Sequence, residues 1–131
     1  MDILNYLKNN IIVLDGGMGT LLQAKGLKVG EHPETWNVTH PEEIINIHKD
    51  YFDSGSNVVS TNTFGANVLK FNETELDKII KSAVENAKKA RTLSKNPSEK
   101  YIALDIGPTG KMLKPFGELD FESAVEIFSK T

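Results

Sequence analysis

The apolar residues of this chain fall into three short runs that are separated by longer amphipathic segments. The runs are Ile11 to Leu14, Val58 to Ser60 and Tyr101 to Leu104, and turn residues flank each of them. None alternates apolar with polar positions. Uninterrupted runs of this kind are typical of strands buried on both faces of a parallel sheet. The sequence therefore predicts three parallel strands joined by crossover segments.

The first crossover segment has the pattern of an amphipathic helix. Apolar residues recur at helical spacing from Ile44 to Phe52. Thr39 and Glu42 have the spacing of a capping box, and Pro41 suits the first turn of a helix. We therefore predict a helix that begins near residue 40 and ends before Gly55.

Three further helices are predicted around the strands. A longer apolar stripe runs from Leu76 to Ala90, and Asn96-Pro97 ends it. A short helix from about Ile3 to Leu7 precedes the first strand, and Asp120 is placed to cap a helix that begins at Phe121.

The predicted order is strand, helix, strand, helix, strand, helix, as in an α/β fold. Three parallel strands are too few to bury both faces of a sheet, and the last apolar stripe meets Thr131 without a terminating residue. We therefore expect residues 1–131 to be a single partial domain that holds about three βα units of a larger α/β domain.

Composition excludes several classes of function. The net charge of -3 argues against a nucleic-acid partner. No apolar run approaches the roughly 20 residues that span a bilayer, and the first ten residues lack the apolar region of a signal peptide, so we expect a cytoplasmic protein with no membrane contact. The chain has no cysteine, which excludes disulfides and any thiolate metal site built from this chain alone.

A glycine-rich loop follows the first predicted strand, with the sequence Asp15-Gly16-Gly17-Met18-Gly19-Thr20. Glycine lets a ligand approach the backbone closely, so free N–H groups next to a carboxylate suit a small zwitterion such as an amino acid. The alternative is a tight strand-to-helix turn that Asp15 caps. A phosphate loop is excluded because no lysine follows the last glycine, and a dinucleotide fingerprint because Leu22 stands at its sixth position.

Two more polar loops are expected on the same face. Thr61 to Gly65 follows the second strand, and Asp105 to Gly110 follows the third. Ligands of parallel α/β folds bind at the carboxyl ends of the strands, so three such loops predict a binding site there. The alternative interpretations are that Asn62 is a turn amide and Asp105 a cap.

The remaining candidate side chains are expected to be structural. His48 lies in an apolar stripe, which favours a partly buried histidine with one hydrogen bond over a ligand role. No two histidines have the i, i+4 spacing of a helical metal site. Trp36 is predicted to be a packing anchor for its loop.

Four segments carry a recognisable pattern, namely Val13 to Thr20, His48 to Tyr51 leading to Gly55, Thr61 to Ala66, and Asp105 to Gly110. Together they resemble the homocysteine S-methyltransferase domain, and within that family the N-terminal module of cobalamin-dependent methionine synthases. Gly65 stands near a position where the betaine-dependent branch carries tyrosine, which favours the methionine synthase branch. The resemblance implies that the chain is the N-terminal part of a homocysteine-binding (β/α)8 TIM barrel.

The resemblance also implies a reaction and a set of binding residues. By the resemblance, the intact domain would be a zinc-dependent enzyme that makes methionine by methyl transfer to the homocysteine thiolate, with methylcobalamin as the expected donor. Asp15 would bind the homocysteine amino group, with the backbone of Gly16 and Gly17 near its amino-acid end. Asn62, Thr63 and the loop that starts at Asp105 would line the same pocket.

The missing cysteines set this chain apart from a complete enzyme. The family takes its zinc ligands from cysteines on later strands, and this chain has none. Alone it is expected to be inactive, with the rest of the barrel and folate- and cobalamin-binding domains as partners. The alternative is a non-catalytic short chain that assembles with a complementary half-barrel or with itself.

Overall fold

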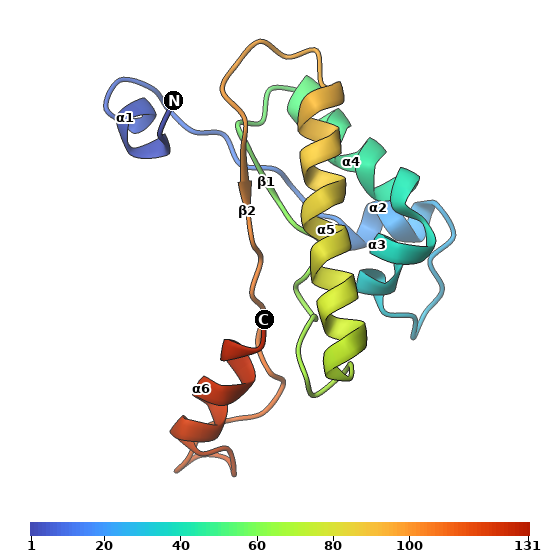
Figure 1. The fold of residues 1–131 in the computed structure, drawn as a ribbon, viewed down its shortest axis with the longest axis vertical. Coiled ribbons are helices and arrows are strands. Elements are labelled where there is room, and N and C mark those ends of the chain that lie inside the picture. Colours follow the sequence, from blue (N-terminus) through green and yellow to red (C-terminus); the bar gives the residue numbers. More distant parts are fainter.

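A computed structural model describes residues 1–131. It has an α/β fold in which helices α4 and α5 lie side by side against one face of a two-stranded sheet, while α1 and α6 lie apart from this layer (Figure 1). None of the helices is both long and apolar enough to cross a membrane. In chain order the elements are α1 (Ile3–Leu7), α2 (Gly19–Ala24), the 3-10 helix η1 (Pro33–Thr35), α3 (Trp36–Thr39), α4 (Pro41–Asp53), β1 (Val58–Ser60), α5 (Glu73–Leu93), β2 (Tyr101–Ala103) and α6 (Phe121–Ser129).

Strands β1 and β2 pair in parallel, with Val58 opposite Tyr101 and Ser60 opposite Ala103. Helix α5 makes the crossover between them, so this part of the chain is a βαβ unit. Because the two strands run in the same direction, their carboxyl ends meet at one edge of the sheet. The loops that follow Ser60 and Ala103 therefore lie near each other.

The prediction of a strand from Ile11 to Leu14 is wrong for this chain. The segment runs beside β1 but forms only one bridge, between Leu14 and Val58. The side chain of Asn57 accepts the Val13 N–H at 3.1 Å, where a regular ladder would use a backbone carbonyl. Ile11 is 86% exposed, so the expected burial on both faces is also wrong here, because helices cover only one face of the sheet.

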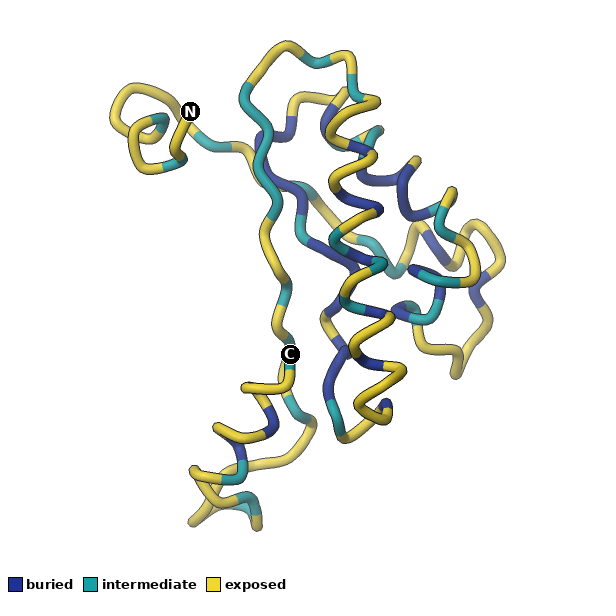
Figure 2. The backbone as a smooth tube through the Cα atoms, viewed as in Figure 1, coloured by how far each residue is buried: buried dark blue, intermediate teal, exposed yellow.

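One of three hydrophobic clusters lies where β1, α4 and α5 meet, and Figure 2 shows that the two ends of the chain are largely exposed. Phe52 of α4 and Val59 of β1 are fully buried. Ala87 and Ala90 let α5 approach them closely because alanine adds little bulk. This packing holds β1 in place and with it the loop that follows.

The helix termini differ in part from the prediction. Helix α4 starts at Pro41 as expected, but Thr39 does not cap it, because the Thr39 hydroxyl donates to the carbonyl of Thr35 in η1. The capping box lies instead at α5, where Asn72 and Glu75 exchange hydrogen bonds. At α6, Asp120 holds the N-cap position without a capping bond.

Trp36 in α3 and His48 in α4 were both predicted to have structural roles. Trp36 is 5% exposed and packs against Leu22, Leu27 and Ile44, which confirms that it anchors its loop. His48 is fully buried and neither ring nitrogen has a hydrogen-bond partner, so the expectation of one hydrogen bond is wrong. The reason is that its helix buries mainly apolar side chains around it. Burial lowers the pKa of His48 to about 4.

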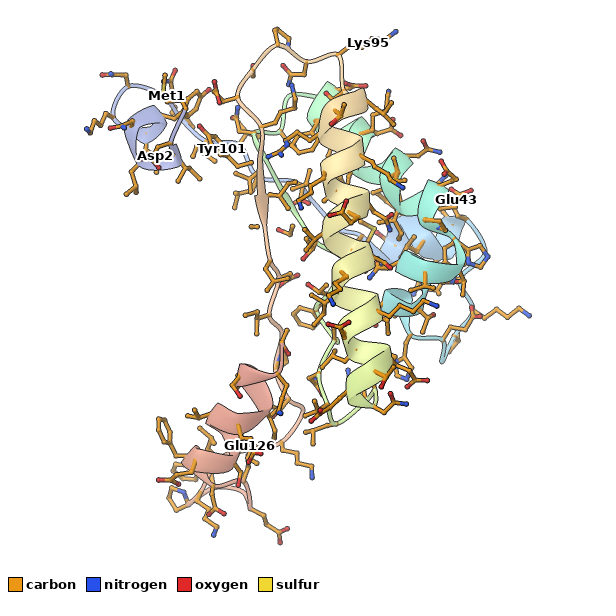
Figure 3. The ribbon with its side chains drawn as sticks, viewed as in Figure 1. Met1, Asp2, Glu43, Lys95, Tyr101 and Glu126 are labelled. Carbon is orange, nitrogen blue, oxygen red and sulfur yellow. The ribbon has the colours of Figure 1, made fainter.

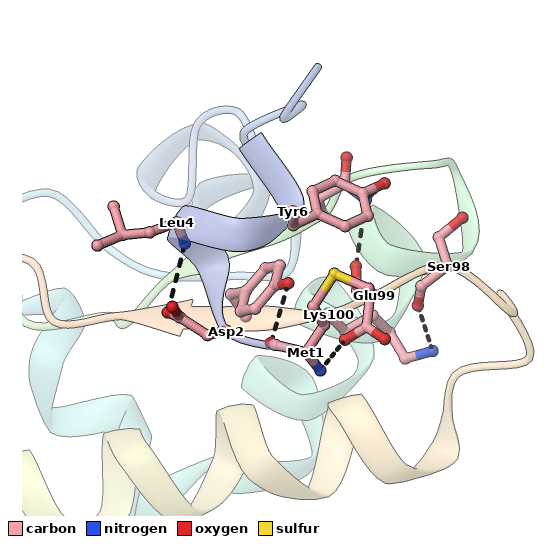
Figure 4. A network of polar contacts seen from close by, with 9 residues as sticks. Met1, Asp2, Leu4, Tyr6, Ser98, Glu99 and Lys100 are labelled. Carbon is pink, nitrogen blue, oxygen red and sulfur yellow. Dashed lines mark hydrogen bonds and ion pairs between the residues drawn. The ribbon is translucent and has the colours of Figure 1, made fainter. Parts of the chain in front are cut away.

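The amino ends of the strands carry a network of paired polar groups. The N-terminal ammonium of Met1 lies 3.0 Å from a carboxylate oxygen of Glu99, and the Tyr101 hydroxyl donates to the Met1 carbonyl at 3.2 Å (Figure 4). Tyr101 points from β2 toward Met1 and Asp2 (Figure 3). Tyr6 of α1 meets the Tyr101 ring edge-on, with centroids 6.0 Å apart. Helix α1 is thereby fixed at the end of the sheet opposite the predicted site.

Candidate functional site

Three segments that are distant in sequence surround a hollow of about 400 Å³ at the carboxyl ends of the strands. Five of the six predicted site residues line it, namely Asp15, Gly16, Gly17, Asn62 and Asp105. Their roles in binding stay predictions. The remaining lining residues are Leu14, Met18, Ser60, Thr61 and Phe64.

The Asp15 carboxylate is held by the neighbouring strand and not by its own loop. The backbone N–H of Ser60 donates to Oδ2 at 2.8 Å, and the Ser60 hydroxyl donates to Oδ1 at 3.2 Å. Helix α2 has Met18 at its N-cap and no side-chain cap, so Asp15 does not cap the helix that follows it. The capped-turn alternative is therefore wrong.

Two opposing effects act on the Asp15 carboxyl. Burial raises its pKa above the ordinary value, the hydrogen bonds from Ser60 act in the opposite direction, and the nearby Asp105 carboxylate raises the pKa further. No ion pair joins Asp15 or Asp105 to a cation of this chain. The hollow therefore carries uncompensated negative charge.

The Tyr51 side chain packs closely against the glycine backbone that follows Asp15. A Cβ at Gly16 would lie 2.9 Å from the Tyr51 hydroxyl oxygen, closer than real Cβ atoms come. The same hydroxyl donates to the Gly17 carbonyl at 2.6 Å. The N–H groups of Gly16 and Gly17 make no hydrogen bond within the chain. These two donors are thus left free at the hollow.

Asn62 lines the hollow, yet its amide is engaged behind it. Its Nδ2 donates to the carbonyl of Pro33 at 2.9 Å and to Oδ1 of Asn37 at 3.0 Å. Asn37 donates in return to the Asn62 carbonyl at 2.8 Å. Both asparagines are buried, so the pair ties the loop after β1 to the start of α3.

Thr63 is the one predicted site residue that does not line the hollow. Its side chain is fully buried, and its hydroxyl donates to the Asp105 carbonyl at 2.7 Å and lies 2.7 Å from the Thr61 hydroxyl. The Thr61 hydroxyl also accepts the Asp105 N–H at 3.2 Å. The two threonines therefore join the loop after β1 to the loop after β2, which places Asp105 at the hollow.

A buried carboxylate explains why residue 65 is glycine. Glu34 is 5% exposed and accepts the Gly65 N–H at 2.6 Å. A Cβ at Gly65 would lie 2.5 Å from the same oxygen, so a larger residue would displace Glu34.

Sequence reasoning missed the contacts of Ser60, Glu34 and Tyr51. A polar last residue in an apolar run was the available signal for Ser60. For Glu34 it was an acid among the uncharged residues of Pro33 to Val38.

The residues of this chain do not fit a zinc ion. No group of three or more His, Cys, Asp or Glu side chains is placed to hold a metal, and the chain has no cysteine. The site is therefore one of carboxylates and backbone donors.

Comparison with known proteins places this chain in a family. The family model of homocysteine S-methyltransferase matches residues 12–131, so the chain belongs to the homocysteine S-methyltransferase family. It is 29% identical over 131 residues to a methionine synthase of Mycobacterium tuberculosis, covering 92% of this chain and 11% of that protein. It is 32% identical over 136 residues to a homocysteine S-methyltransferase of Escherichia coli, covering 92% and 43%.

The structural comparison agrees with the sequence comparison. The metallated form of the homocysteine methyltransferase MmuM from Escherichia coli superposes with a TM-score of 0.70 at 30% identity, covering 81% of this chain and 41% of that chain. The α/β arrangement is thus that of part of a homocysteine methyltransferase. The chain spans less than half the length of these relatives.

Proposed function

We propose that this chain supplies the amino-acid-binding part of a homocysteine S-methyltransferase domain, as the first three βα units of a (β/α)8 barrel. The observation that carries the proposal is the Asp15 carboxylate, oriented by Ser60 beside the free N–H groups of Gly16 and Gly17. Membership in the family supports homocysteine as the amino acid.

The charges of the site match the ionised ends of an amino acid. An ammonium group bound at Asp15 would form a charge-assisted hydrogen bond and would offset the negative charge shared with Asp105. The backbone N–H groups of Gly16 and Gly17 are donors for the carboxylate end. The loop would therefore bind the ammonium group of the ligand at the Asp15 carboxylate and the carboxylate of the ligand at the glycine N–H groups.

The methyl-transfer chemistry would come from outside these residues. A thiolate is the nucleophilic form of homocysteine, and a bound zinc ion favours that form. Because the residues of this chain do not fit zinc, we propose that zinc, methylcobalamin and any folate-binding partner are held elsewhere in the intact protein. The role of this chain is to bind and orient the amino-acid end of the substrate.

A second candidate is a non-catalytic chain that pairs with a complementary half-barrel or with itself. The observation that favours it is apolar exposure along the bare side of the sheet, where Leu14 is 65%, Ile106 54% and Leu104 42% exposed. Patches of this kind mark interaction surfaces. Sedimentation of the chain at several concentrations, with and without the remaining barrel units, separates this candidate from a self-sufficient fold.

Ligand binding to the 131-residue chain tests the first proposal. We expect L-homocysteine to shift the amide resonances of Gly16, Gly17 and Asp105 in an NMR titration. The deamino analogue of homocysteine keeps the carboxylate and the thiol, so it should shift the glycines but bind more weakly. A folded chain whose glycine resonances ignore homocysteine, or that binds both ligands equally, contradicts the proposal.

A further inference from the structure

Two residues that are not proposed to touch the ligand contact the Asp15 loop from different sides. Tyr51 belongs to the last part of α4, in the segment from His48 to Gly55 that the family resemblance singles out. Ser60 is the last residue of β1. One comes from the helical layer and the other from the sheet, so together they connect the loop to both layers of the fold.

Tyr51 determines the path of the glycine backbone. Its hydroxyl donates to the Gly17 carbonyl across 34 residues of sequence, and its ring occupies the space next to Gly16, where a Cβ would lie 3.3 Å from ring atom Cε1. Burial raises the pKa of the Tyr51 hydroxyl, and the negative charge of Asp15 raises it further. The hydroxyl therefore keeps its proton at neutral pH and can donate this hydrogen bond.

Ser60 determines the orientation of the carboxylate. Each oxygen of Asp15 has its own donor on Ser60, one from the backbone and one from the hydroxyl. The backbone of Asp15 is fixed as well, because its N–H donates to the Val58 carbonyl at 2.9 Å. With both oxygens and the main chain held by β1, the carboxylate cannot turn away from the hollow without breaking these bonds.

We propose that Tyr51 and Ser60 are positioning residues of the amino-acid site: Ser60 orients the Asp15 carboxylate for an ammonium group, and Tyr51 orients the Gly16-Gly17 N–H groups for a carboxylate. The inference rests on the proposed function. A site whose groups are already oriented binds without the entropy cost of ordering them, so both residues raise affinity without touching the ligand's reacting atoms.

The ligand-free protein gives the first test. Ser60→Ala removes the hydroxyl donor and keeps the backbone donor, so we expect the pKa of Asp15, followed by carboxyl NMR, to rise above its wild-type value. Ser60→Thr keeps a hydroxyl and should restore it. Ser56→Ala is the matched control, because the Ser56 hydroxyl contacts the Leu14 carbonyl of the same segment at 3.4 Å and not the carboxylate.

Ligand selectivity gives the second test. Ser60→Ala should weaken L-homocysteine about threefold to tenfold, the value of one hydrogen bond, and should leave the deamino analogue unchanged. Tyr51→Phe keeps the ring against Gly16 and should weaken both ligands by the same factor, because both carry the carboxylate. Tyr101→Phe, whose hydroxyl bonds the Met1 carbonyl at the far end of the sheet, should change neither.

The outcomes distinguish a positioning role from a purely structural one. An Asp15 pKa that is the same in Ser60→Ala and wild type overturns the role of Ser60. If Ser60→Ala weakens both ligands alike, or if the affinity lost in Tyr51→Phe only follows lost thermal stability, the residue concerned is structural. If wild-type chain binds neither ligand while the Asp15 pKa still rises in Ser60→Ala, the proposed function fails and the orientation of Asp15 by Ser60 stands.

Discussion

The two ends of the small sheet are built from polar residues in opposite ways. At the amino ends, the Met1 ammonium pairs with Glu99, and hydrogen bonds join Tyr101 to Met1 and Asn57 to the Glu99 carbonyl. At the carboxyl ends, Asp15 and Asp105 carry charge of one sign with no cation of the chain beside them. The polar groups at the amino ends are paired within the chain, whereas the two carboxylates at the carboxyl ends would need a cation from outside the chain.

This contrast gives a physical criterion for a binding site. Polar groups that are paired with each other hold elements together, as the contacts at α1 do. Polar groups that are oriented but uncompensated at an accessible hollow cost stability and are retained where a ligand supplies the missing partner. His48 tests this criterion, because it is an unpaired polar side chain that is fully buried and lies at no accessible hollow.

The largest effect is expected at His48, which is unpaired and fully buried. Its pKa is lowered from 6.5 to about 4 by burial, so the unfolded chain binds a proton more readily than the folded chain between these values. Stability is therefore present above pH 6.5 and is lost as pH falls toward 4, by about 3 kcal/mol at most.

Denaturant unfolding of wild type and His48→Leu at several pH values measures this contribution. The difference between the two profiles cancels the other titrating groups. We expect the wild type to lose more stability than the variant between pH 6.5 and 4. Parallel profiles would show that burial does not hold His48 neutral. An unpaired buried group would then carry no measurable cost, which contradicts the criterion.

The next largest effect is expected for Asp15→Asn in the intact enzyme. The amide keeps the shape and replaces a charge-assisted hydrogen bond with a neutral one, a loss of about 1.5 to 3 kcal/mol, so kcat/KM for homocysteine should fall roughly tenfold to a few hundredfold. Bound metal should be unchanged, because Asp15 is not proposed as a ligand. The melting temperature should rise at neutral pH, because a buried neutral group replaces a buried charge.

Normal kcat/KM in Asp15→Asn would contradict the role of Asp15 in substrate binding. Glu99→Gln is the matched carboxylate control from the amino end of the sheet. It should leave kcat/KM unchanged, and a loss similar to that of Asp15→Asn would erase the contrast between the two ends.

A smaller effect is expected for Gly65→Ala. The new methyl group would meet the Glu34 carboxylate, so the loop after β1 would have to shift or the buried acid lose its hydrogen bond. Overpacking of this kind costs about 1 to 3 kcal/mol of unfolding free energy. Gly19→Ala, whose Cβ would meet nothing within 4 Å, should not be destabilised, and equal losses in both variants would argue against the Glu34 contact.

The smallest effect is expected for the ion pair at the amino end. The Met1 ammonium and Glu99 are 55% and 41% exposed in their side chains, and pairs of this kind contribute about 0 to 1 kcal/mol. Glu99→Gln should therefore lower the melting temperature only slightly, and less in high salt because ions screen the pair. A large, salt-independent loss would mean that the pair carries more of the fold than its exposure indicates.

Sequence patterns correctly predicted the elements that depend mainly on their own local sequence. Helix α1 and strand β1 have the expected bounds, and α5 contains the predicted stripe. The run from Ile11 to Leu14 was misjudged because a strand needs partners on its edges and a cover on its faces, and the apolar pattern does not say whether this chain provides them. The pattern also placed a capping box at Thr39, whose hydroxyl instead donates to the carbonyl of Thr35, four residues earlier.

The site divides in the same way. The positions of Asp15 and Asp105 at the hollow follow from their place after apolar runs, which sequence can show. The contacts of Ser60 to Asp15, Tyr51 to Gly17 and Glu34 to Gly65 bridge 45, 34 and 31 residues, so they exist only in three dimensions. Sequence thus identified most of the groups that line the hollow and missed the contacts that Ser60, Tyr51 and Glu34 make.

The hydrogen bond between Ser60 and Asp15 also bears on how the chain folds. It closes a loop of 45 residues, and the bond between Thr61 and Asp105 closes one of 44, each enclosing a whole crossover helix. Contacts this far apart in sequence form late, because the entropy of closing the loop is lost before any contact is gained. The hollow should therefore be among the last features to appear during refolding. A ligand that binds at the hollow would stabilise the folded chain and slow its unfolding. During refolding, its binding would show that both of these long-range contacts have formed.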